Sequence, residues 1–128
     1  MRRLLVLLLC CTGVTSALSD PQVVSVRSGS TQTVMIHLAF RDWLLSRETP
    51  NEIRLQTPWG TLQTIPQGRP HDQRSTYFGL LYPAALRLYV PGQVAAARYP
   101  ARLEATLYVC QKQQQLCSRR QLVLPVVL

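Results

Sequence analysis

Short runs of residues that alternate between apolar and polar side chains are the feature that most limits how this chain can fold. In residues 31–40, TQTVMIHLAF, every second residue from Val34 to Phe40 is large and apolar. This period of two, combined with β-branched residues, is typical of a strand with one buried face. Further runs that favour strands occupy residues 22–27, 52–57, 60–65, 77–82, 85–90, 102–110 and 121–128. The sequence therefore predicts seven or eight short strands.

Turn signals separate these runs. Pro58-Trp59-Gly60 and Pro83 each divide two successive runs, which are expected to pair with one another. Pro125 lies inside the last run and favours an edge position or a bulge there. No segment has a sustained helical period, and residues 41–47, RDWLLSR, allow at most a turn or two of helix. The pattern predicts an all-β sandwich of two packed antiparallel sheets.

The first residues have the pattern of a signal peptide. Arg2 and Arg3 precede an unbroken apolar run from Leu4 to Cys11, and Thr15-Ser16-Ala17 supplies small residues for cleavage. No later apolar run approaches the roughly 20 residues that span a bilayer. We therefore predict a signal peptide at residues 1–17 and a single exported domain at residues 18–128, located in the periplasm, outside the cell or in the cell envelope. Lipid attachment at Cys10 or Cys11 is left open.

The charge balance is basic, with 14 Lys and Arg against 6 Asp and Glu. Beyond the predicted signal peptide the positive residues are scattered, and only Arg119-Arg120, near Lys112, form a cluster. Nucleic-acid binders concentrate such charge and interleave aromatic residues with it. A solvated basic surface without a nucleic-acid partner is therefore expected.

Residue patterns for other chemistry are absent from the sequence. His37 and His71 are the only histidines, and both are far from the cysteines in sequence, so no metal site is predicted. His71-Asp72 with Ser75 has the residue types of a hydrolase triad but lacks the glycines of a nucleophile elbow. There is no glycine-rich phosphate loop either, and no small-molecule cofactor is expected.

Two cysteines remain beyond the predicted signal peptide, Cys110 and Cys117, and in an exported domain they predict a disulfide. They flank a polar loop between two predicted strands, so they are expected to face one another across a hairpin. Directly opposed residues in such a pair have Cα atoms roughly 4.5–5.5 Å apart, which suits a disulfide. Closing so short a loop contributes only about 2.5 kcal/mol, so the bridge can be opened without unfolding the domain.

Cations near this pair favour the thiolate form. Lys112, Arg119 and Arg120 lie within three residues of a cysteine. Because alternate residues of a strand share a face, Arg119 is expected beside Cys117. Cys117 is therefore predicted to be the cysteine that reacts first.

The end of the chain resembles a known family. The residues that carry the resemblance are Leu107-Tyr108-Val109-Cys110, Leu116-Cys117, Tyr89-Val90-Pro91-Gly92 and Tyr99-Pro100-Ala101-Arg102-Leu103, with a weaker likeness at Ser46-Arg47-Glu48-Thr49-Pro50. They are similar to the N-terminal periplasmic domain of the thiol:disulfide interchange protein DsbD. The cysteine loop is one residue longer here than in the best-known members, and Ser118-Arg119-Arg120 replaces a proline-rich segment.

This resemblance implies an immunoglobulin-like sandwich in which Cys110 and Cys117 exchange disulfides. It implies a membrane thiol–disulfide transporter and thioredoxin-like proteins as partners, and an aromatic cap over the cysteines, for which Tyr77 and Phe78 are the candidates. Two hypotheses follow. The chain is either an exported thiol–disulfide exchange domain or a non-catalytic immunoglobulin-like binding or assembly module whose bridge is structural.

Overall fold

The structure is a computed structural model that describes residues 18–90, 98–113 and 116–128. These residues form strands and no helix. The strands are β1 (Gln22–Ser28), β2 (Thr31–His37), β3 (Trp43–Leu45), β4 (Glu52–Thr57), β5 (Gly60–Thr64), β6 (Gly68–Pro70), β7 (Phe78–Leu81), β8 (Ala84–Tyr89), β9 (Pro100–Gln111) and β10 (Cys117–Val127). The predicted signal peptide lies outside the described residues.

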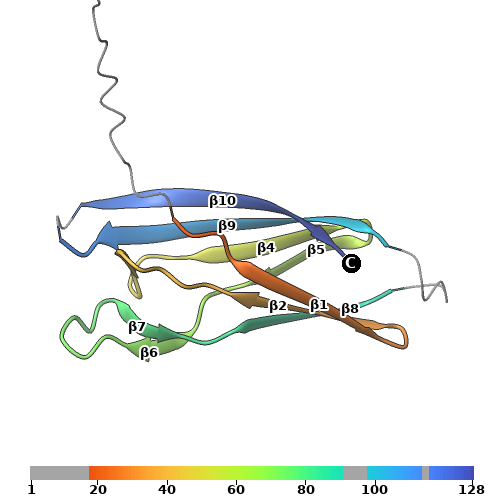
Figure 1. Cartoon of the computed structure of the whole chain (residues 1–128), viewed down its shortest axis with the longest axis horizontal. Coiled ribbons are helices and arrows are strands. Elements are labelled where there is room, and N and C mark those ends of the chain that lie inside the picture. Colours follow the sequence, from red (N-terminus) through yellow and green to blue (C-terminus); the bar gives the residue numbers. More distant parts are fainter. Residues whose placement is uncertain (1–17, 91–97, 114–115) are drawn as a thin grey trace, which may run out of the picture.

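Two antiparallel sheets make the body of the molecule. One has the order β1-β2-β8, and the other has the order β10-β9-β4-β5, with β3 also paired to β9. Figure 1 shows them as two layers, with β10, β9, β4 and β5 above and β1, β2 and β8 below. This arrangement corresponds to the A-B-E and G-F-C-C′ strands of immunoglobulin domains. The expected immunoglobulin-like, all-β sandwich is confirmed.

The hydrophobic core lies between the two layers because strand alternation sends one set of apolar side chains inward from each. Val34 and Ile36 of β2 meet Ile53 of β4 and Leu103 and Leu107 of β9 in one buried cluster. Each of these five side chains is at most 1% exposed. Both sheets therefore share one core, and every second residue of β9 points away from it.

One expectation about pairing is wrong, and one segment without an expected strand forms one. Residues 77–82 and 85–90 do not form a hairpin, because β7 pairs with β6 whereas β8 pairs with β2 in the sandwich. Tyr82 and Pro83 lead the chain from one sheet to the other instead, and proline offers no amide to a tight hairpin. Residues 41–47 contain the buried strand β3 and no helical turn. The edge position expected from Pro125 is confirmed, since β10 is the outer strand of its sheet.

A break between β3 and β4 shapes the end of the sandwich that carries the cysteines. Both strands pair with the same side of β9, but residues 46–51 leave the ladder between them. The buried Asn51 side chain fills this break: its Nδ2 donates to Ser46 O at 2.7 Å, and its Oδ1 accepts from Tyr108 N at 2.8 Å. Asn51 thus replaces the backbone partners that a continuous strand would have supplied to β9.

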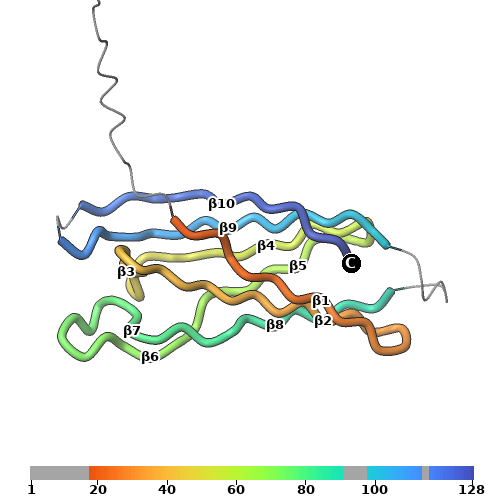
Figure 2. The backbone as a smooth tube through the Cα atoms, viewed as in Figure 1, coloured from red at the N-terminus to blue at the C-terminus, as the bar shows by residue number. Residues whose placement is uncertain are grey.

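The β6–β7 pair lies at the same end as β3, as the tube in Figure 2 shows. An isolated bridge joins Ser46 to Tyr77, and Arg47 N donates to Thr76 O at 2.8 Å. A side chain at Gly68 would collide with the backbone of Leu80, so glycine is needed for β6 to lie this close to β7. These contacts hold residues 71–77, the loop between β6 and β7, against the edge of β3.

Candidate functional site

The predicted disulfide joins the next-to-last residue of β9 to the first residue of β10. Cys110 and Cys117 are register partners, their sulfur atoms are bonded, and their Cα atoms are 3.9 Å apart. Gln111 N donates to Leu116 O at 2.8 Å, one position beyond the pair on each strand. The two cysteines therefore occupy a non-hydrogen-bonded pair, the kind in which opposed Cα atoms come closest.

The two sulfur-bearing residues differ sharply in exposure. Cys110 is 3% exposed, whereas Cys117 is exposed to solvent. Alternation places Cys110 on the outer face of the sheet, away from the core that Val109 joins. It is buried nonetheless, because it has the buried Leu44 of β3 as its neighbour on one side and Tyr77 over its sulfur.

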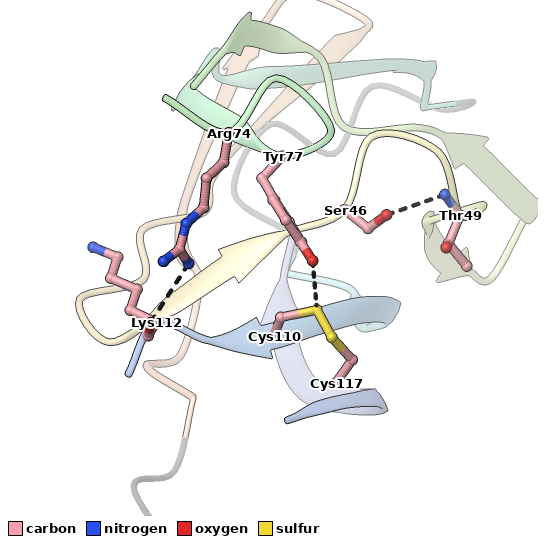
Figure 3. Close-up of a disulfide and its surroundings, with 7 residues drawn as sticks. All are labelled: Ser46, Thr49, Arg74, Tyr77, Cys110, Lys112 and Cys117. Carbon is pink, nitrogen blue, oxygen red and sulfur yellow. Dashed lines mark hydrogen bonds between the residues drawn. A yellow bond between two sulfur atoms is a disulfide. The ribbon is translucent and has the colours of Figure 1, made fainter. Parts of the chain in front are cut away.

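Tyr77 provides a hydrogen bond to the bridge. Its hydroxyl donates to Cys110 Sγ at 3.3 Å, and Figure 3 shows the ring reaching from the β6–β7 loop to the sulfur. The loop is closed by two backbone bonds, from His71 N to Tyr77 O at 2.8 Å and from Tyr77 N to Arg74 O at 3.0 Å. A polar hydrogen is thus held at the buried sulfur by a short segment with its own internal hydrogen bonds.

Phe78, the other expected cap residue, lies elsewhere. It packs against the hydrophobic core as the first residue of β7, with the Arg47 guanidinium 6.0 Å from its ring centroid. Since consecutive strand residues point to opposite faces, Tyr77 and Phe78 cannot both face the bridge. The structure brings Tyr77 to the disulfide and places Phe78 against the core.

The three cations that were expected near the cysteines point in different directions. Lys112 Nζ donates to Arg41 O at 2.9 Å and points away from the disulfide in Figure 3. Arg120 lies on the other face of β10, where its guanidinium is 5.4 Å from the centroid of the Trp43 ring. Arg119 is exposed and shares the outer face with Cys117. Arg119 is therefore the one of the three that strand geometry places beside the exposed sulfur.

Sequence reasoning did not identify Leu44 and Asn51 as parts of the site. Leu44 lies in a segment expected to allow at most a turn or two of helix, and only its pairing with β9 shows that it covers Cys110. Asn51 had a usable signal, because a small amide residue just before a strand commonly bonds to nearby backbone.

No protein family, curated protein or solved structure matches this chain. The site is therefore interpreted from its own geometry. Within the described residues, no group of three or more His, Cys, Asp and Glu side chains could hold a metal ion. The same part of the chain has no helix long and apolar enough to cross a membrane.

The arrangement is suited to nucleophilic attack on sulfur. A thiolate from solvent can reach the exposed Cys117 without any movement of the core. The buried Cys110 would then be the departing sulfur, and the Tyr77 hydroxyl is already positioned to donate to it. A hydrogen bond to a thiolate stabilises the charge that develops on a departing sulfur.

Proposed function

We propose that this chain is an exported thiol–disulfide exchange domain that passes electrons between a membrane thiol donor and extracytoplasmic oxidoreductases through Cys110 and Cys117. The observation that carries the proposal is the asymmetry of the bridge. Cys117 is exposed to solvent, whereas Cys110 is buried beneath a hydroxyl that can stabilise its sulfur as a thiolate.

The exchange begins when a thiolate of a partner attacks Cys117 Sγ. A mixed disulfide forms between the partner and Cys117 as the Cys110–Cys117 bond breaks, and its electron pair goes to Cys110 Sγ. A second thiolate of the partner then attacks the partner's own sulfur and releases Cys117 as a thiolate. The partner dithiol becomes a disulfide, the domain becomes a dithiol, and two electrons have moved; the reverse sequence reduces a partner.

The resemblance at the C-terminal hairpin supports the choice of partners. A membrane thiol–disulfide transporter and thioredoxin-like proteins are those that the resemblance implies. The signal-peptide pattern at residues 1–17 supports export to the compartment in which such partners act. The fold adds a physical argument: the bridge lies at the end of an edge strand, where a second protein can approach the exposed sulfur.

The reduction potential of the Cys110–Cys117 pair tests the proposal. The purified chain is equilibrated in glutathione and dithiothreitol buffers, and its thiols are counted by alkylation. We expect a potential near −200 mV, in the range of working exchange proteins. A potential well below about −300 mV would instead identify the bridge as structural, as the binding-module hypothesis requires.

Replacing the Tyr77 hydroxyl gives a sharper form of this test. Tyr77→Phe keeps the ring over the sulfur but removes a donor that stabilises the reduced form, so the potential is expected to become more negative by roughly 10–30 mV. Tyr89→Phe is the matched control, because Tyr89 lies on β8 in the opposite sheet and is exposed. Equal potentials in both variants would show that the Tyr77 hydroxyl has no part in the redox balance.

A further inference from the structure

A pocket opens at the cysteine-bearing end of the sandwich, between the end of β2, β3 and β7. It has a volume of about 510 Å³, within the range of small-molecule sites in proteins. Its apolar wall is formed by the side chains of Leu38, Phe40, Trp43, Leu45, Phe78 and Leu81. Neither the cysteines nor Tyr77 are among the lining residues, so the pocket is distinct from the disulfide, although it shares Leu44 with the exchange site.

The polar side chains among the residues that line the pocket are those of Gln22, His37, His71 and Lys112. His71 and Lys112 line it, and none of the described residues that line it is Asp or Glu. Lys112 Nζ uses one hydrogen for Arg41 O, which leaves two further N–H groups. A ligand that complements the positive charge of Lys112 therefore carries a negatively charged hydrogen-bond acceptor.

The tautomer of His71 follows from its own hydrogen bonds. Its Nδ1 accepts from Gln73 N at 3.2 Å and from Arg74 N at 3.1 Å. A ring nitrogen that accepts carries no hydrogen, so the neutral imidazole has its hydrogen on Nε2. His71 therefore offers a second donor, and the loop that it closes keeps the ring in place.

Trp43 belongs to the apolar wall of the pocket. It lines the pocket at 5% exposure, and its buried Nε1 has no hydrogen-bond partner in the described part of the chain. Because solvent does not reach this nitrogen, a ligand in the open pocket meets the indole ring and not its N–H.

We propose that this pocket binds a small apolar carboxylate, with the hydrocarbon against the Phe40–Trp43–Phe78 wall and the carboxylate toward His71 and Lys112. The polar group is assigned to that side because Lys112 is the one Lys or Arg among the described residues that line the pocket. This site goes beyond the exchange function and does not depend on it.

Tryptophan fluorescence of the full chain provides the test, with octanoate as the probe. The Trp59→Phe variant leaves Trp43 as the sole tryptophan and as a reporter inside the pocket. We expect octanoate to change Trp43 emission with saturation in the millimolar range or below, and octan-1-ol to bind about tenfold more weakly because it lacks the charge. Absence of a saturable change, or equal affinities for the two probes, would overturn the proposal.

Two charge variants in the same background locate the carboxylate. Lys112→Gln is expected to weaken octanoate binding about tenfold and to leave octan-1-ol binding unchanged. Arg87→Gln is the control, since Arg87 is an exposed cation on β8, outside the pocket lining. An octanoate affinity that is the same in Lys112→Gln and in its parent overturns the assignment. The Cys110–Cys117 reduction potential is measured separately, so either proposal can fail alone.

Discussion

At the residue scale, the two cysteines are chemically unequal although they share one bond. Cys110 is buried under Tyr77 and beside Leu44, while Cys117 stands at the start of an edge strand in solvent. Burial opposes the charged form of the Cys110 thiol, and the Tyr77 hydrogen bond favours it, so the two effects on this sulfur compete. At the exposed Cys117 the neighbouring Arg119 charge favours the thiolate form, and burial does not oppose it.

We predict that Cys117 is the first of the two thiols to react. In the reduced protein, iodoacetamide should modify the Cys110→Ser variant, which retains Cys117, faster and at lower pH than the Cys117→Ser variant. Alkylation rates measured against pH check this. Adding Arg119→Gln to the Cys110→Ser variant should raise the pH at which Cys117 reacts, and a faster reaction of the Cys110 thiol would contradict the prediction.

The candidate site could be predicted from the sequence only where it is local. The bridge follows from two cysteines flanking a polar loop between strands, and the place of Arg119 follows from alternation. The burial of Cys110 could not be derived in this way, because Leu44 and Tyr77 reach it from segments that are distant in sequence. Tyr77 was suggested by resemblance, which did not distinguish it from Phe78.

At the scale of the elements, the break between β3 and β4 is the feature that prepares the site. If β3 and β4 formed one continuous strand, its backbone would bond to Tyr108 N in place of the Asn51 side chain. No segment would then leave the ladder to form the bridge between Ser46 and Tyr77. The alternation of residues 52–57 was sufficient to predict β4. The three residues of β3 are all buried, so they show no alternation, and a run that short does not reveal a strand.

Asn51→Ala should destabilise the protein by about 2–3 kcal/mol, because Tyr108 N and Ser46 O would lose their partners in a buried place. Urea unfolding followed by circular dichroism gives the value. Gln63→Ala on the exposed face of β5 is the control and should change stability by less than about 0.5 kcal/mol. Equal losses in the two variants would show that the Asn51 side chain does not stabilise the break.

At the scale of the whole molecule, one core joins the two sheets, and the disulfide lies outside it. The largest buried side chains come from β2, β3, β4 and β9, and neither cysteine belongs to their cluster. The sandwich was predictable because most of its long strands, such as β2, β4 and β9, show alternation in the sequence. The order of the strands within each sheet was not predictable, because it is decided by how distant segments fit around a common core.

The double variant Cys110→Ser/Cys117→Ser should therefore remain folded, with a loss of at most about 2–3 kcal/mol from a domain stability of roughly 5–15 kcal/mol. Urea melts of the oxidised wild type and the double variant measure the difference. The far-ultraviolet spectrum should stay that of a β protein in both. Complete unfolding of the double variant in buffer would make the bridge a structural requirement.

The placement of both cysteines on one hairpin also sets the order of events during folding. β9 and β10 are sequence neighbours whose ladder runs from Cys110–Cys117 to Pro100–Val127. Hairpins close in about 1–10 μs, whereas an oxidant forms a disulfide in seconds or longer. The ladder therefore aligns the two thiols before any oxidant acts, and oxidation is a late step that follows the backbone. The chain therefore does not need its bridge to reach this hairpin topology.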